Sequence, residues 1–260
     1  MDLEGKVAIV TGSSSGIGAS TALAIARRGG SVVVNCSRSR DAADAVAAEC
    51  RALGGDAIVV AANVADDADC RALADAAMKR WGRIDWLVNN AGTTRFVQIR
   101  NLSGISAEDF QAIYAVNVIG AFQMVRACET ALRAARGAVV NVSSIASQDG
   151  LGSSIGYASS KGALNTLTIG LAKALGPDVR VNAVLPGFIE GGWLQAGFGS
   201  TYETVRDTYK SQAALEEVMT PDDIAHTIVW LLDSPKTTGQ LLRVDAGKGL
   251  GRLPTTLKPA

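Results

Sequence analysis

VAIVTGSSSGIG, residues 7–18, is a short apolar run followed at once by a glycine-rich loop. The apolar run predicts a strand over residues 7–11. The residues after the loop predict a helix over 16–28, which Gly29 and Gly30 end. Glycines let the loop turn tightly and let the phosphates of a dinucleotide approach the free N–H groups at the helix start. Taken alone, the motif is also compatible with a plain turn between a strand and a helix.

The same alternation of short apolar runs and longer Ala-rich amphipathic stretches continues along the chain. It predicts further strands over residues 31–35, 57–61, 86–89, 138–143, 180–184 and 241–244, and further helices over 41–53, 66–81, 107–135 and 157–175. This order is typical of repeated βαβ units. We therefore expect one catalytic domain over residues 1–260, a doubly wound α/β fold of the Rossmann type with a seven-stranded parallel sheet.

Composition argues against several classes of partner. Lys plus Arg and Asp plus Glu both number 25, so no broad basic surface is expected for nucleic acid or anionic lipid. The chain starts with acidic residues and has no apolar run long enough for a membrane helix, so we expect a cytoplasmic protein. Four cysteines without a Cys-x-x-Cys pair and a single histidine predict buried thiols and no metal site.

Tyr157 and Lys161 stand four residues apart in a predicted helix, and Ser144 precedes the tyrosine by thirteen residues. Side chains at this spacing are neighbours on a helix, about 5–6 Å apart at Cβ. A phenol with an ordinary pKa of about 10 is a poor acid or base at neutral pH, and a nearby ammonium group is predicted to lower its pKa by about two units. The pair therefore indicates hydride-transfer chemistry, although a helix-surface contact is the alternative for the pair alone.

The chain resembles the short-chain dehydrogenase/reductases, and its pattern is similar to the ketoacyl-carrier-protein reductase branch. The resemblance covers nearly the whole length. It rests on seven segments in the family's order: residues 11–18, Asn89-Asn90-Ala91-Gly92, Val116-Asn117-Val118, Asn141-Val142-Ser143-Ser144, Tyr157-Ala158-Ser159-Ser160-Lys161, Arg180-Val181-Asn182 and Pro186-Gly187.

The resemblance implies reversible reduction of a small ketone to a secondary alcohol by a catalytic set of four residues. Tyr157 would be the acid or base at the reacting oxygen, and Ser144 would hydrogen-bond that oxygen. Lys161 would lower the pKa of Tyr157 and reach the ribose of the cofactor. Asn117 would hold a water that links Lys161 to solvent.

The resemblance also implies the cofactor contacts. These would be Gly12, Ser14, Ser15, Gly16, Ile17, Gly18, Asn63, Val64, Asn90, Ala91, Gly92, Tyr157, Lys161, Pro186, Gly187 and Ile189. Gly191 departs from the family pattern, which often has a threonine there to bind the nicotinamide amide.

The end of the second predicted strand indicates which dinucleotide is preferred. An NAD enzyme is expected to have an acidic residue there for the ribose, and residues 31–40 contain none. Ser37 and Arg38 instead offer a hydroxyl and a guanidinium group suited to a 2′-phosphate, so we expect NADP(H) to be favoured over NAD(H). The alternative is that Arg38 and Arg40 are solvated loop charges. Ser15 stands where related NADP enzymes often carry a basic residue, which weakens the preference.

The region after Pro186-Gly187 interrupts the βαβ pattern. Residues 187–212 are rich in glycine and aromatic side chains, which predicts a flexible segment covering the substrate. The aromatic residues favour either an apolar, bulky substrate pocket or packing of this segment onto the core or a neighbouring subunit. Residues 245–260 are expected to form a surface arm or a subunit contact. The resemblance further implies a homo-oligomer, a tetramer or dimer, formed by the helices that hold Asn117 and Tyr157.

Two other functions fit parts of the sequence. Gly12-Ser13-Ser14-Ser15-Gly16 and Gly152-Ser153-Ser154-Ile155-Gly156 match the Gly-x-Ser-x-Gly elbow of serine hydrolases. The one histidine, His226, is expected on a helix, packed against its neighbours. The other alternative is a sensor or scaffold protein that binds the dinucleotide without turnover.

Overall fold

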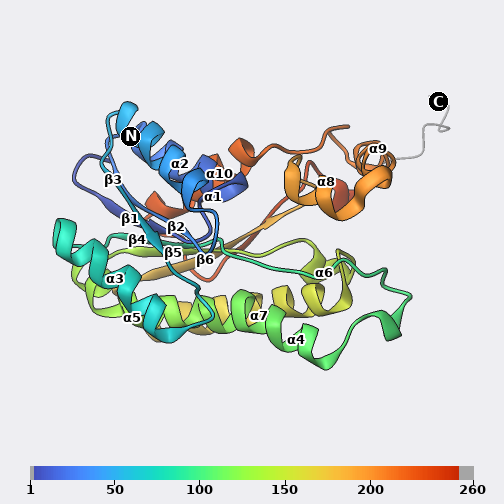
Figure 1. Ribbon diagram of the computed structural model, residues 1–260, viewed down its shortest axis with the longest axis horizontal. Coiled ribbons are helices and arrows are strands. Elements are labelled where there is room, and N and C mark those ends of the chain that lie inside the picture. Colours follow the sequence, from blue (N-terminus) through green and yellow to red (C-terminus); the bar gives the residue numbers. More distant parts are fainter. Residues whose placement is uncertain (1–2, 252–260) are drawn as a thin grey trace.

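The computed structural model describes residues 3–251, which form one α/β domain around a seven-stranded parallel sheet (Figure 1). The strand order is β3-β2-β1-β4-β5-β6-β7. The strands are β1 Val7–Val10, β2 Ser31–Cys36, β3 Ala57–Ala61, β4 Trp86–Asn89, β5 Ala138–Val142, β6 Arg180–Pro186 and β7 Leu241–Val244. The predicted fold class is confirmed, and every strand lies within two residues of its predicted bounds.

Helices cover both faces of the sheet, as Figure 1 shows. One face carries α1 Gly16–Ala26, α2 Arg40–Ala52 and α10 Pro221–Asp233; the other carries α3 Asp67–Trp81, α5 Ala121–Ala135 and α7 Ile155–Leu175. Successive side chains of a strand point to opposite faces. Ala8 and Val10 therefore belong to the core under α1 and α10, while Val7 and Ile9 belong to the core under α3 and α5. Burial on both faces explains why these strands are continuous apolar runs.

The direction of strand addition reverses at β1. Val10 pairs with Val34 of β2 on one side and with Val88 of β4 on the other. The loops that leave β1 and β4 therefore diverge to opposite faces of the sheet, and ligands of doubly wound folds bind at such a switch point, outside the carboxyl ends of the strands.

The helix predicted over residues 107–135 has the right extent but is not a continuous α-helix. It consists of α4 Ala107–Tyr114, a π-helical segment Ala115–Gly120 and α5. A Cβ at Gly120 would lie 2.8 Å from the carbonyl oxygen of Val64, so the segment packs directly on the backbone that follows β3. The wider turn changes which residues face inward and buries Asn117.

The segment 187–212 is more regular than predicted. It contains α8 Gly192–Phe198, a 3₁₀ turn at Gly199–Thr201 and α9 Tyr202–Gln212. Shorter elements complete the chain: the 3₁₀ turns Leu102–Gly104 and Lys248–Leu250, and α6 Ala146–Asp149.

The start of the predicted C-terminal arm packs on the domain. The Leu215 N–H donates to the Ala246 carbonyl at 3.0 Å, so residues 245–251 lie beside the end of α9. The remainder of the arm, 252–260, falls outside the described residues. The four cysteines are buried free thiols, as predicted. Within residues 3–251, no helix has both the length and the hydropathy to cross a membrane.

Candidate active site

A cavity of about 1340 Å³ lies at the carboxyl ends of the strands. Its lining includes residues that directly follow β1 through β6, such as Gly12, Ser37, Asn90, Ser144 and Gly187. Of the predicted catalytic and cofactor residues, all line this cavity except Ser14, Gly18 and Asn117. The topology thus collects in one place residues that are up to 177 positions apart, from Gly12 to Ile189.

The glycine loop is held from both sides by side-chain amides. Asn35 at the end of β2 accepts from the Gly12 N–H at 2.9 Å and donates to the Ala62 carbonyl at 3.0 Å. Asn90, after β4, donates to the Thr11 and Gly12 carbonyls at 2.8 and 3.0 Å. The loop therefore has a defined shape without a ligand. The role of Asn35 in holding the glycine loop was not predicted, although a polar residue inside an otherwise apolar strand could have indicated it.

The geometry of the loop and of the N-terminus of α1 fits a dinucleotide pyrophosphate. Ser15 precedes α1 without capping it through its side chain, whereas Ser154 caps α7 by accepting from the Tyr157 N–H at 3.1 Å. The first turn of α1 also contains no acidic residue. A Cβ at Gly12 would lie 2.9 Å from Cα of Ala91, so the loop packs closely against the backbone after β4 and leaves no room for a side chain at this position. Free N–H groups at a helix start attract anions.

Gly18 and Ser14 do not line the cavity, although both were predicted to contact the cofactor. Gly18 lies under the loop, where a Cβ would be 2.5 Å from the Asn90 amide nitrogen and 2.6 Å from the Gly12 carbonyl oxygen. It permits close packing of α1 on the loop and does not face the cavity. Ser14 is half-buried and lies away from the cavity lining.

Tyr157, Lys161 and Ser144 meet inside the cavity. Tyr157 and Lys161 are on the first turns of α7, and Ser144 follows β5. The Lys161 ammonium group donates to the Val142 carbonyl at 2.7 Å and lies 5.6 Å from the centre of the Tyr157 ring. Ser144 hydrogen-bonds the Tyr157 side chain. The predicted proximity of the three side chains is confirmed.

The predicted effect of Lys161 on Tyr157 is wrong for the protein without ligands. Burial raises the pKa of Tyr157 to about 12, although the hydrogen bond with Ser144 acts in the opposite direction. Burial also lowers the pKa of Lys161 to about 8. Desolvation penalises both charged forms, so burial raises the pKa of Tyr157 and lowers that of Lys161, and the net shift of the Tyr157 pKa is opposite to the predicted one. The phenol therefore stays protonated through neutral pH, the form that donates a proton.

Asn117 is buried and connects two of the segments that carry the site. Its amide donates to the Thr93 carbonyl and to Ser160 Oγ, both at 3.0 Å, and accepts from the Thr93 N–H at 2.8 Å. These bonds join the loop after β4 to α7. Asn117 is 1% exposed and is not among the residues that line the cavity.

One part of the cavity lies beside the ends of β2 and β3. Ser37, Arg38, Asn63 and Val64, which were predicted to contact the cofactor, line it. Ser37 and Arg38 are exposed, and among the described residues no carboxylate forms an ion pair with Arg38. Arg40, in contrast, pairs with Asp44 at 3.0 Å.

The aromatic residues of the segment 187–212 divide between two roles. Phe188 is buried and contacts the rings of Phe198, Tyr202 and Tyr209 at centroid distances of 6.4, 5.5 and 5.3 Å, which packs α8 and α9 onto the end of β6. Trp193 instead is 52% exposed, and its ring lies edge-on to the Tyr157 ring with 6.0 Å between the ring centroids. Both predicted roles, wall of an apolar cavity and packing of the segment, are therefore present in one structure.

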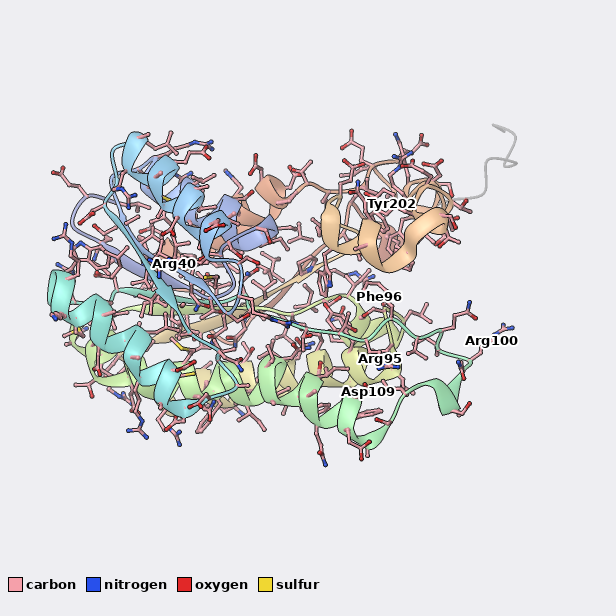
Figure 2. The ribbon with its side chains drawn as sticks, viewed as in Figure 1. Arg40, Arg95, Phe96, Arg100, Asp109 and Tyr202 are labelled. Carbon is pink, nitrogen blue, oxygen red and sulfur yellow. The ribbon has the colours of Figure 1, made fainter. Side chains whose placement is uncertain are left out.

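The loop between β4 and α4 contacts the same segment from the opposite side. Phe96 lies at 5.6 Å from Phe198 in an edge-to-face contact, and Arg95 pairs with Asp109 of α4 at 3.2 Å. Figure 2 shows Phe96, Arg95 and Asp109 on one side of this region and Tyr202 of α9 on the other. Phe96 was not predicted as a residue of this region, because the loop that carries it has no periodic pattern.

The arrangement of a serine hydrolase is not found. His226 lies on α10, as predicted, but it is exposed and does not line the cavity, and no hydrogen bond of the described residues joins it to a serine. Ser154 is used as the N-cap of α7.

Comparisons with known proteins span nearly the whole chain. The profile of the protein family described as enoyl-(acyl carrier protein) reductase matches residues 12–248. A Streptomyces violaceoruber protein assigned as ketoacyl reductase 2 of the granaticin polyketide synthase is 44% identical over 95% of this chain and 97% of its own.

Two solved structures share the fold. A crystal structure assigned as a short-chain dehydrogenase/reductase from Burkholderia xenovorans has a TM-score of 0.88 and 42% identity, covering 95% of this chain and 98% of its own. The structure of an NAD⁺-bound xylitol dehydrogenase has a TM-score of 0.87 and 28% identity, covering 95% of this chain and all of its own (100%).

Proposed function

Because the chain belongs to the short-chain dehydrogenase/reductase family and is an NAD(P)-dependent oxidoreductase, we propose that it uses NADPH to reduce a ketone to a secondary alcohol. One observation carries the proposal: Ser144, Tyr157 and Lys161 converge on a cavity whose other end fits a dinucleotide. The reverse oxidation uses the same residues.

In the proposed reaction, Tyr157 donates its phenolic proton to the ketone oxygen. The dinucleotide, when bound, supplies the hydride. Ser144 hydrogen-bonds the same oxygen and stabilises the charge that develops there. The Lys161 ammonium group, 5.6 Å from the phenol ring, favours the phenolate that remains after proton transfer. The protein contributes mainly alignment and charge stabilisation.

Asn117 is proposed as the residue that holds a water between Lys161 and solvent, so that the proton can be replaced. Its place beside Gly92 supports this role, because a Cβ at Gly92 would lie 3.5 Å from Asn117 Oδ1 and 3.7 Å from Lys161 Nζ.

The cofactor contacts are proposed for the predicted residues that line the cavity. Gly12, Ser15, Gly16 and Ile17 would hold the pyrophosphate, and Asn63 and Val64 would border the adenine. The rest of the dinucleotide would be flanked by Asn90, Ala91, Gly92, Pro186, Gly187 and Ile189. Tyr157 and Lys161 would lie beside the nicotinamide ribose. Gly191, at a φ of 151°, adopts a conformation that a threonine would rarely adopt, so backbone groups are proposed to replace that side chain.

Arg38 is proposed to select NADPH by binding its 2′-phosphate. We predict that Arg38→Ala raises the KM for NADPH by about tenfold or more and leaves the KM for NADH unchanged, because only NADPH loses a charge-assisted hydrogen bond. Steady-state kinetics with both cofactors measures this. Arg40→Ala is the matched control, since Arg40 is occupied by Asp44 and does not line the cavity. An equal loss with both cofactors would contradict the assignment.

The pH dependence of reduction should follow Lys161. With the pKa of Lys161 near 8 and that of Tyr157 near 12, the active form has both groups protonated at neutral pH. As pH rises through about 8, Lys161 loses the charge that favours the phenolate, so kcat/KM for ketone reduction should fall. A profile from pH 6 to 10 measures this, and Lys161→Met should remove the decline along with most activity. A rate that rises over this range in the wild type would contradict the assignment.

The sensor alternative is separated from the reductase by turnover. The test is a screen of ketones and secondary alcohols with NADPH, NADH and their oxidised forms, followed by absorbance of the reduced nicotinamide. Turnover of any ketone supports the proposal. Binding of a dinucleotide by calorimetry without turnover of any compound would favour the sensor.

A homo-oligomer is proposed as well. Ile119 and Phe122 near Asn117, and Ile155 and Ile169 on α7, are 39–50% exposed, which is unusual for large apolar side chains on two adjacent helices. Sedimentation velocity measures the state, and a monomer at all concentrations would contradict it.

A further inference from the structure

A lysine at the substrate end of the cavity has no part in the proposed reaction. Within residues 3–251, four charged residues line the cavity: Arg38, Lys161, Glu190 and Lys248. Arg38 and Lys161 are accounted for by the dinucleotide and the reacting oxygen. Lys248 follows β7, on the far side of β6 from the glycine loop, and its ammonium group lies 4.7 Å from the centre of the Tyr209 ring.

Tyr209 places this lysine on the side where the substrate must bind. Its ring packs on Phe188 at 5.3 Å and lines the cavity. The Tyr209 phenol also contributes to the raised pKa of Tyr157, so the two phenols are close enough to interact. The Lys248 ammonium group over Tyr209 therefore lies in the same cavity as Tyr157.

The carboxylates near Lys248 are occupied by another cation. Asp149 accepts from Arg243 at 3.1 and 3.2 Å, and Asp245 accepts from Arg243 at 2.5 Å and from the Gly249 N–H at 2.8 Å. Within residues 3–251, no carboxylate forms an ion pair with Lys248. Among the described residues, Glu190 is the one acidic residue of the lining, and no ion pair joins it to Lys248.

We propose that Lys248, held over the Tyr209 ring, binds a carboxylate carried by the ketone substrate at a position remote from the reacting carbonyl. The inference rests on the proposed reductase function and narrows its substrate class to oxo acids with an apolar body. Trp193 and Phe198 line the same cavity and would contact that body. The aromatic face holds the ammonium group without neutralising it, which leaves its N–H donors for an anion.

The test compares phenyl ketones that bear a terminal carboxylate two, three or four methylene groups from the carbonyl with their methyl esters. Isothermal titration calorimetry on the protein with NADP⁺ measures each dissociation constant. For at least one length, the acid should bind the wild type about tenfold or more tightly than its ester, as expected for a charge-assisted hydrogen bond. Lys248→Met should reduce that ratio to about one while leaving the affinity for the ester unchanged.

Lys210→Met is the matched control, because Lys210 is exposed on α9 and does not line the cavity. It should keep the wild-type ratio. Equal affinity of acid and ester at every length, including undetectable binding of both, would overturn the proposal, as would a ratio that survives Lys248→Met. Reduction kinetics form a separate readout: a wild type that binds the acid with this preference but oxidises no NADPH contradicts the proposed function and leaves the carboxylate site supported.

Discussion

Tyr157→Phe should lower kcat for ketone reduction by about a thousandfold, within the range of 10²–10⁴ that a positioned general acid contributes. The substitution removes one hydroxyl group and leaves the ring, which packs edge-on to Trp193 at 6.0 Å. It also leaves Lys161 bonded to the Val142 carbonyl. The variant should therefore fold and still bind NADPH, so that the loss appears mainly in kcat.

Stopped-flow or steady-state oxidation of NADPH measures the rate, and fluorescence titration measures cofactor binding. Tyr202→Phe is the matched control, because Tyr202 is buried against Phe188 and does not line the cavity. It should keep nearly full activity. A Tyr157→Phe variant as fast as the wild type would remove the phenol from the mechanism.

Gly18→Ala is the second change with a large expected effect. The new methyl group would lie 2.5 Å from the Asn90 amide nitrogen, 2.6 Å from the Gly12 carbonyl oxygen and 2.8 Å from Cα of Ser13. Two of these atoms are backbone, so the glycine loop itself must move. Overpacking of this kind costs about 1–3 kcal/mol in the free energy of unfolding. A displacement of about 1 Å in a binding loop can also weaken function about a hundredfold.

We therefore expect Gly18→Ala to lower the free energy of unfolding by about 2 kcal/mol, measured in urea, and to weaken NADPH binding by at least tenfold. Gly170→Ala is the control: Gly170 is an exposed residue of α7, and a Cβ there meets nothing within 4 Å. It should raise the free energy of unfolding by about 0.5–1 kcal/mol, because alanine loses less backbone entropy in a helix. If Gly18→Ala kept the wild-type free energy of unfolding and the wild-type affinity for NADPH, the glycine loop would accommodate the added methyl group more easily than its contacts imply.

Most of the fold was predictable because its signals are local. Strands such as β1 and β5 are buried on both faces, so their sequences are unbroken apolar runs. The proximity of Tyr157 and Lys161 was predictable for a similar reason, since i and i+4 side chains of any helix are neighbours. The π-helical turn at Asn117 was not predictable, because it depends on the contact of Gly120 with the backbone after β3, which is distant in the sequence.

The direction in which the pKa of Tyr157 shifts was also not predictable from the sequence alone. The spacing of Tyr157 and Lys161 predicted an attraction of known sign, but not how much water would be lost around both groups. That loss depends on tertiary packing, such as the edge contact of Trp193 with Tyr157, which no local pattern specifies.

The amino-acid sequence by itself determined the order of strands and helices, the glycine loop between β1 and α1 and the pairing of Tyr157 with Lys161, because each of these follows from residues close together in the chain. Only the tertiary structure decided which residues share the cavity and which charges remain unpaired within it. Lys248 is the clearest case: it lines the cavity without a carboxylate partner among the described residues, while Arg243 pairs with Asp149 and Asp245, and this division of charges exists only after the strands have assembled.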